Sequence, residues 1–132
     1  MIVIDASVLF EVVADTPGAE ALRQRLSGDP DHAAPHIIDI EVFGVIRREH
    51  LLGRLDTTAA TQAVADLRDW PGERYGHRSL LERAWELRAT VRGWDAAYVA
   101  LAEALDATLV TTDGRLAAAP GPACVIEVIA AG

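Results

Sequence analysis

The sequence predicts an α/β protein in which a small parallel β-sheet of four to five strands carries helices on both faces. Short, wholly apolar runs such as Met1–Ile4 are typical of strands buried on both sides. Longer segments with apolar residues at helical spacing alternate with these runs, which favours a parallel sheet. The chain has 132 residues and is 51% hydrophobic, so we expect residues 1–132 to form a single domain with its own core.

The first half of the chain divides into strands and helices at clear breaks. Pro17 suits the first turn of a helix, Gly53 is typical of a residue that ends one, and Pro71 stops the helix before it. In order, a strand, two helices, a strand and two further helices are predicted over residues 1–4, 6–14, 17–27, 32–35, 37–52 and 57–70.

One predicted helix in the second half, over residues 96–105, is apolar nearly all round. Only Glu103 interrupts it, and a helix without a polar face is buried. The helix before it, over residues 79–91, is amphipathic, with Leu80, Leu81 and Leu87 expected to face inward. The other expected elements are strands over residues 73–77, 107–111 and 124–129 and a short helix that ends at Ala119.

The charge of the chain limits the kinds of nucleic-acid binding that it can perform. The formal net charge is −8, and all twelve basic residues are arginine. An acidic protein binds polyanions poorly in a non-specific way, which counts against a role in coating nucleic acid. It does not count against an acidic metal site, which is built from carboxylates.

Cysteine content and hydropathy favour a cytoplasmic protein. Cys124 is the single cysteine, so an intrachain disulfide is excluded, and its apolar surroundings predict a small residue buried in the core. No segment reaches the length of a membrane span. No positively charged region precedes the first apolar run, so a signal peptide is not expected.

Two acids follow predicted strands directly. Asp5 ends the strand over residues 1–4, and Asp113 follows the strand over residues 107–111. Ligands in open α/β sheets bind at the carboxyl ends of the strands, so both acids are in position for chemistry. Each could instead cap the helix that begins after it, and for Asp113 a Thr-Asp-Gly turn is a further alternative.

Two more acids belong to helices. Glu41 has Ile37, Ile38 and Val45 as helical neighbours, so it lies on an apolar face. A carboxylate there needs an arginine or a cation, because burying it unpaired is costly. Its neighbour Gly44 would let another backbone approach. Asp95 stands at the start of the buried helix, where it could be an N-cap or could meet the other acids near the centre of the domain.

Four acids at one end of one sheet would repel each other unless a cation neutralised them. Oxygen ligands of this kind suit Mg²⁺ or Mn²⁺ rather than zinc. The histidines do not form a zinc site, since Pro35 separates His32 from His36, and His50 and His77 are isolated. All four histidines are interpreted as surface or loop residues.

The chain resembles PIN-domain proteins, specifically the VapC-type toxin ribonucleases of type II toxin–antitoxin systems. The run Asp-Ala-Ala-Tyr-Val-Ala-Leu-Ala after Trp94 is the most specific feature. The other matching segments are Val3–Ser7, the helix around Glu41 and the segment Leu109–Asp113. The resemblance spans the whole chain and implies a PIN-like fold with the acids in the family order.

The resemblance also implies the site residues: metal-binding and catalytic acids at Asp5, Glu41, Asp95 and Asp113, and auxiliary hydroxyls at Ser7 and Thr111. Some family members carry a further acid just after the fourth, where this chain has Gly114 and Arg115, so the number of metal ions stays open.

The activity implied by the resemblance is that of an endoribonuclease dependent on Mg²⁺ or Mn²⁺, acting on structured RNA such as transfer or ribosomal RNA. The implied partners are a small antitoxin and a second copy of the chain in a homodimer. The chemistry agrees with the residues, because a metal can activate water and stabilise charge on a phosphate oxygen, so that no nucleophilic side chain is needed.

Other functions remain open. A phosphoryl-transfer enzyme could use Asp5, but such sites typically need a lysine and this chain has none. A nucleotide-binding Rossmann unit is disfavoured because no glycine-rich loop follows the first strand. A metal-stabilised module could bind RNA or a partner without turnover. Four arginines expected to be exposed would then make the contacts: Arg23, Arg25, Arg47 and Arg48.

Overall fold

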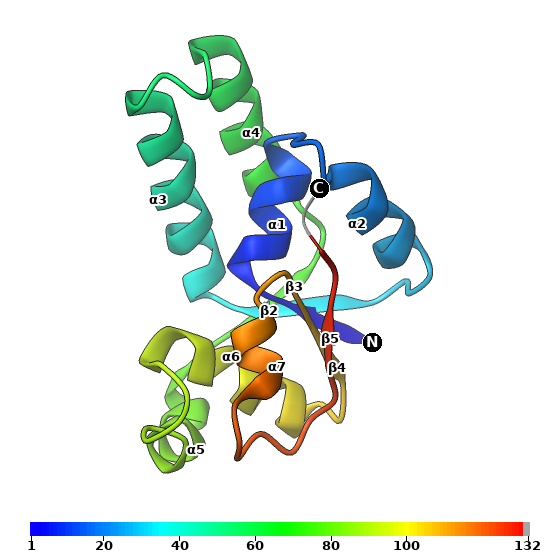
Figure 1. Cartoon of the computed structure of the whole chain (residues 1–132), viewed down its shortest axis with the longest axis vertical. Coiled ribbons are helices and arrows are strands. Elements are labelled where there is room, and N and C mark those ends of the chain that lie inside the picture. The colour runs from blue at the N-terminus through cyan, green and yellow to red at the C-terminus, as the bar shows by residue number, and fades with distance from the viewer. Residues whose placement is uncertain (131–132) are drawn as a thin grey trace.

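The computed structural model describes residues 1–130 and has a five-stranded sheet at its centre (Figure 1). All neighbouring strands are parallel, and their order is β3-β2-β1-β4-β5. The predicted α/β class with a parallel sheet is therefore confirmed. The strands are β1 (Ile2–Ile4), β2 (His32–Pro35), β3 (Glu73–Tyr75), β4 (Thr108–Thr111) and β5 (Ile126–Val128).

Strand β1 is the middle of the sheet because each of its residues is apolar and buried. Val3 pairs with Ala33 on one side and with Leu109 on the other. From β1 the chain first builds the sheet toward β2 and β3, and later returns to add β4 on the other side. The order of the strands thus reverses between β1 and β4, and ligands of open α/β sheets bind at such a point.

Helices cover both faces of the sheet, as the sequence predicts. In Figure 1, the helices from α1 to α4 lie on one side of the strands and those from α5 to α7 on the other. No helix within residues 1–130 is long and apolar enough to cross a membrane. The helices are α1 (Ala6–Val13), α2 (Ala19–Ser27), α3 (Ile37–Leu51), α4 (Thr57–Asp69), α5 (Leu81–Glu86), α6 (Gly93–Ala104) and α7 (Gly114–Ala118).

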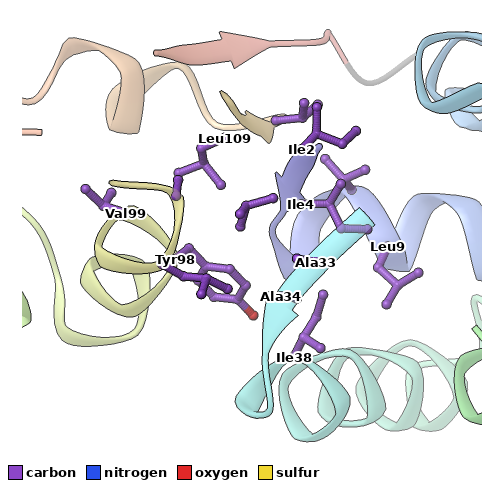
Figure 2. Close-up of a cluster of buried hydrophobic side chains, with 14 of the residues drawn as sticks. Ile2, Ile4, Leu9, Ala33, Ala34, Ile38, Tyr98, Val99 and Leu109 are labelled. Carbon is purple, nitrogen blue, oxygen red and sulfur yellow. The ribbon is translucent and has the colours of Figure 1, made fainter. Parts of the chain in front are cut away.

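The core forms between the sheet and its helices, and α6 is its most buried helix. Tyr98 reaches from α6 toward the strands, and Leu9 and Ile38 approach from α1 and α3 (Figure 2). Six residues of α6 are buried: Ala96, Tyr98, Val99, Ala100, Leu101 and Ala102. The prediction of a buried helix in this segment is therefore confirmed, although α6 begins at Gly93 rather than Ala96.

The predicted helix over residues 79–91 is wrong in extent and in one inward residue. A single 3₁₀ turn over Arg78–Leu80 precedes α5, and α5 ends at Glu86. Leu81 is 60% exposed, whereas Leu87 and Val91 are buried. The chain turns after Glu86 to bring those two side chains inward, and β-branched Thr90 and Val91 favour helix less than other residues.

Cys124 and Arg25 also differ from expectation. Cys124 is partly rather than fully buried and packs against the edge of the core. Arg25, expected to be exposed, pairs with Glu127 through Nε at 2.5 Å and Nη2 at 3.1 Å. The bidentate pair ties α2 to β5, at the far edge of the sheet.

Candidate functional site

The four predicted acids line one cleft of about 700 Å³. Two of them come from the point where the strand order reverses: Asp5 follows β1, and Asp113 follows β4. Glu41 comes from α3 and Asp95 from the first turn of α6. The structure therefore brings together acids that lie more than a hundred positions apart in the sequence.

Asp5 is the most enclosed of the four acids, with 6% of its surface exposed. Ser7 Oγ donates to Oδ1 at 2.5 Å, Thr111 Oγ1 donates to Oδ2, and the Val8 N–H donates to Oδ1 at 3.2 Å. Burial raises the pKa of Asp5 in spite of these three donors, and the charge of Asp95 raises it further. The bond from Val8 also makes Asp5 the N-cap of α1. Asp5 therefore caps a helix, as one alternative predicted, and also lines the cleft.

The hydroxyls of Ser7 and Thr111 join the ends of β1 and β4. Besides donating to Asp5, Ser7 Oγ accepts from the Thr112 N–H at 3.1 Å, and Thr111 Oγ1 accepts from the Asp113 N–H at 3.0 Å. Thr111 is fully buried. Both residues therefore lie where the sequence predicts auxiliary hydroxyls, in direct contact with the first acid.

Glu41 is half-buried on α3, and within residues 1–130 its hydrogen-bond partner is a tyrosine rather than an arginine. Tyr98 donates its hydroxyl hydrogen to Oε1 at 2.7 Å. Burial raises the pKa of Glu41, and the charges of Asp95 and Asp5 raise it further. The expected role of Gly44 in a close backbone approach is wrong, because a Cβ there would meet nothing within 4 Å. Gly44 instead lines the cleft.

Arginines from the same chain segments accompany the other two acids. Arg92 Nη2 lies 3.5 Å from Asp95 Oδ2, and Arg115 Nε lies 3.3 Å from Asp113 Oδ1. Burial raises the pKa of Asp95, while the Arg115 backbone N–H lowers that of Asp113. Asp113 caps α7, as one alternative held, but Asp95 does not cap α6, because Arg92 occupies the cap position.

The cleft as a whole is acidic. Glu11 and Glu49 line it together with the four predicted acids, and its arginines are Arg48 and Arg92. Among residues 1–130, no three His, Cys, Asp or Glu side chains already stand as a metal-binding group. No histidine of this part of the chain lines the cleft. Two have local structural bonds instead: His32 to the carbonyls of Leu26 and Asp29, and His50 to that of Leu55.

Three residues of the site were not expected from the sequence. Tyr98 could have been found, because a buried tyrosine hydroxyl normally requires a partner and Tyr98 stands one turn after Asp95. Arg92 and Arg115 carry no signal of their own, since arginines near acids usually belong to the solvated surface. Of the arginines expected to be exposed, Arg48 reaches the cleft, and Arg23 pairs with Asp15 at 2.9 Å.

Comparisons with known proteins agree with this architecture. The model of the PIN domain family matches residues 2–122. Ribonuclease VapC12 of Mycobacterium tuberculosis is 38% identical over 130 residues, which cover 98% of this chain and all of that protein.

Two solved structures share the fold. One is M. tuberculosis VapC20, described as a sarcin-ricin loop cleaving toxin, with a TM-score of 0.69, 20% identity, and coverage of 89% of this chain and 94% of the other. The second is a toxin–antitoxin complex from Klebsiella pneumoniae, with a TM-score of 0.61, 20% identity and coverage of 86% and 87%. By sequence and by fold, this chain belongs to the PIN-domain family and is a relative of the VapC ribonucleases.

Proposed function

We propose that this protein is a metal-dependent endoribonuclease and the toxin of a toxin–antitoxin pair. The observation that carries the proposal is the meeting of Asp5, Glu41, Asp95 and Asp113 in one cleft at the carboxyl ends of β1 and β4. The relationship to proteins named as VapC ribonucleases supports RNA as the substrate.

The chemistry of the cleft fits a hard divalent cation. All four acids offer oxygen ligands, which Mg²⁺ and Mn²⁺ prefer. Burial, and then the charges of neighbouring acids of the cleft, raise the pKa values of Asp5, Glu41 and Asp95. A cation would relieve the repulsion between these charges. Because the side chains of residues 1–130 do not yet form a metal-binding group, Asp95 and Asp113 would have to turn toward an ion held by Asp5 and Glu41.

The residues of this chain have distinct tasks in the proposed reaction. Asp5, held by Ser7 and Thr111, provides the fixed ligand around which the others gather. When bound, Mg²⁺ or Mn²⁺ activates water and offsets negative charge on the phosphate. With Asp95 and Asp113 holding the cation, Arg92 and Arg115 would no longer pair with these acids, and each guanidinium could bind a phosphate of the RNA backbone.

The direction of cleavage follows from direct attack by water on the phosphorus, with the 3′-oxygen as the leaving group. The phosphate then stays on the downstream fragment. Histidine-based ribonucleases instead use the 2′-hydroxyl of the RNA and leave a cyclic phosphate, which requires a base and an acid placed across the phosphate. We therefore expect 5′-phosphate and 3′-hydroxyl ends.

The test is cleavage of RNA by the purified protein, with the ends of the products identified. Cleavage should stop in EDTA and return with Mg²⁺ or Mn²⁺. Cyclic-phosphate ends, or full activity in EDTA, would overturn the proposed chemistry. Binding of RNA without any cleavage would instead favour the non-catalytic module.

The proposed partners are a small antitoxin and a second copy of this chain. The shared fold with a toxin–antitoxin complex and the acidic cleft, which can receive arginines of a partner, support the antitoxin. Expression of the protein alone should arrest growth. Mapping cleavage across cellular RNA after brief induction, with Asp5→Ala as the control, would identify the substrate among transfer and ribosomal RNAs. Harmless expression of a protein that cuts RNA well in vitro would refute the toxin assignment.

A further inference from the structure

Tyr98 places a buried polar group beside one of the proposed metal ligands. Its side chain is 1% exposed and is the largest fully buried side chain in the described part of the chain. In Figure 2 the ring extends from α6 with its oxygen directed toward the region where β2 leads into α3. The hydroxyl donates to Glu41 Oε1 at 2.7 Å, across 57 positions of sequence.

The state of this hydroxyl is well defined. Burial, together with the charges of Glu41, Asp5 and Asp95, raises the pKa of Tyr98 far above its ordinary value. Since even an ordinary tyrosine has a pKa of about 10, the phenol is protonated near neutral pH and can donate to Glu41 as the geometry shows.

Glu41 depends on this donor more than Asp5 depends on any one of its own. Within residues 1–130, Asp5 receives bonds from Ser7, Thr111 and the Val8 N–H, whereas the bond recorded for Glu41 comes from Tyr98. Glutamate also has one more rotatable bond than aspartate, and so loses more freedom when it is ordered. Without Tyr98, the Glu41 carboxylate would be free to rotate about its longer stem.

We propose that Tyr98 is a positioning residue for the cation site: its hydroxyl occupies Oε1 of Glu41 and so turns the remaining carboxylate lone pairs toward the cleft. This inference rests on the proposed metal-dependent function. Tyr98 stands one helical turn after Asp95 on α6, so a single rigid helix supplies one ligand and orients another. Outer partners of metal ligands typically act in this way.

Orientation matters most for an ion with strict geometry. Mg²⁺ requires a nearly ideal octahedral arrangement of oxygens, whereas Ca²⁺ accepts six to eight oxygens in flexible arrangements. Loss of the Tyr98 hydroxyl should therefore weaken Mg²⁺ binding more than Ca²⁺ binding. If the bond to Glu41 served only to pair a buried hydroxyl, removing the hydroxyl would change folding stability and leave the affinities for Mg²⁺ and Ca²⁺ unchanged.

The chain offers a matched control, because it has two tyrosines. Tyr75 lies in β3 and does not line the cleft. Tyr98→Phe and Tyr75→Phe each remove one phenolic oxygen, and binding of Mg²⁺ and Ca²⁺ to the RNA-free proteins can be measured by calorimetry. We expect Tyr98→Phe to weaken Mg²⁺ binding by about 10- to 100-fold, to weaken Ca²⁺ binding less, and to raise the Mg²⁺ concentration needed for half-maximal cleavage. Tyr75→Phe should match wild type.

A double-mutant cycle shows whether Tyr98 acts through Glu41. In a Glu41→Gln background, Tyr98→Phe should cause little further loss of Mg²⁺ affinity. A full additional loss would overturn the inference, as would equal loss of Mg²⁺ and Ca²⁺ binding in Tyr98→Phe alone. If wild type itself binds no divalent cation, the proposed function fails; if wild type binds and Tyr98→Phe binds equally well, only this inference fails.

A second measurement covers the case in which Tyr98→Phe does not fold. In Tyr75→Phe, Tyr98 is the single tyrosine, so a ¹³Cζ-tyrosine label gives one NMR signal that reports on its hydrogen bond. Titration with Mg²⁺ should move this signal with the same midpoint as calorimetric binding. A signal that stays unchanged through saturation would contradict the contact between Tyr98 and the site.

Discussion

The four acids of the cleft fall into two pairs that are held in different ways. The inner pair, Asp5 and Glu41, receives hydrogen bonds from the uncharged hydroxyls of Ser7, Thr111 and Tyr98. The outer pair, Asp95 and Asp113, lies beside guanidinium groups of Arg92 and Arg115 whose side chains are 73% and 83% exposed.

The inner carboxylates thus have partners fixed within the fold, whereas the partners of the outer carboxylates can be exchanged. Buried neutral donors fix the inner carboxylates without neutralising them, so their charge remains available to a cation. Exposed ion pairs contribute little stability, so a cation or a phosphate can displace the arginines of the outer pair at small cost. Four predictions test this contrast, from the largest expected effect to the smallest.

Asp5→Asn should all but abolish cleavage. The substitution removes the charge of the most enclosed acid but keeps its shape, so we expect the fold to persist. The rate of RNA cleavage should fall by more than about 100-fold, because about 100-fold is the upper range for losing a residue that only contacts a metal ligand. Circular dichroism checks the fold, and a single-turnover assay measures the rate. Activity close to wild type would remove Asp5 from the centre of the site.

Metal binding should raise thermal stability, and the outer pair should contribute to the gain. At a Mg²⁺ concentration 100 times its Kd, mass action gives about 2.7 kcal/mol. Asp95→Asn should reduce this gain and abolish cleavage without unfolding the protein. An unchanged response to Mg²⁺ together with full activity in Asp95→Asn would show that the acids do not share one ion.

Removing an outer arginine should have a small effect on binding of RNA. Arg115→Ala deletes an exposed group, so we expect KM for RNA to rise by less than about fivefold, in line with the worth of an exposed ion pair, with kcat nearly unchanged. Arg23→Ala, whose arginine pairs with Asp15 away from the cleft, is the control. A large drop in kcat for Arg115→Ala would mean that this residue acts on the reacting phosphate.

In metal-free protein, the pH dependence of stability should distinguish Asp113 from the other three acids. The folded state holds protons on Asp5, Glu41 and Asp95 more tightly than the unfolded state does, because their pKa values are raised from 3.8, 4.5 and 3.8. In EDTA the free energy of unfolding should therefore fall as pH rises from these ordinary values through the raised ones. Asp113, with a lowered pKa, contributes the opposite slope, in which stability is lost as pH falls below about 3.8.

Urea denaturation from about pH 4 to about pH 7 measures this dependence. Asp5→Asn should flatten the decline, and saturating Mg²⁺ should remove it, because the ion favours the charged carboxylates. The same pH dependence in wild type and in Asp5→Asn would contradict the raised pKa of Asp5.

Strands, helices and the meeting of the acids were largely predictable from the sequence. Short apolar runs and helical periodicity report burial, which decides where β1, α3 and α6 form. The acids could be placed because parallel strands end at one edge, so Asp5 and Asp113 had to be neighbours if β1 and β4 paired. Their roles as metal ligands stay predictions.

The misses share a physical origin: they depend on tertiary contacts that no local pattern records. Leu81 has the spacing of a core residue, yet α5 is too short to bury it. The donor to Glu41 is a tyrosine 57 positions away, which the spacing of α3 alone does not record, and the cation at Glu41 stays a prediction. Arg25 has the spacing of an exposed residue, but its partner Glu127 lies on the last strand.

The pairing of β1 with β4 also sets when the site can form. The hydrogen bonds of Ser7 to Thr112 and of Thr111 to Asp5 join residues 105 and 106 positions apart, and contacts between such distant residues form slowly because a long loop must close first. During synthesis, at about 5–20 residues per second, β4 is made several seconds after β1, and until then β1 has no partner on that side. A nascent chain that stops before β4 therefore carries Asp5, Glu41 and Asp95 but no assembled centre, so the proposed nuclease would stay inert until most of its length had left the ribosome.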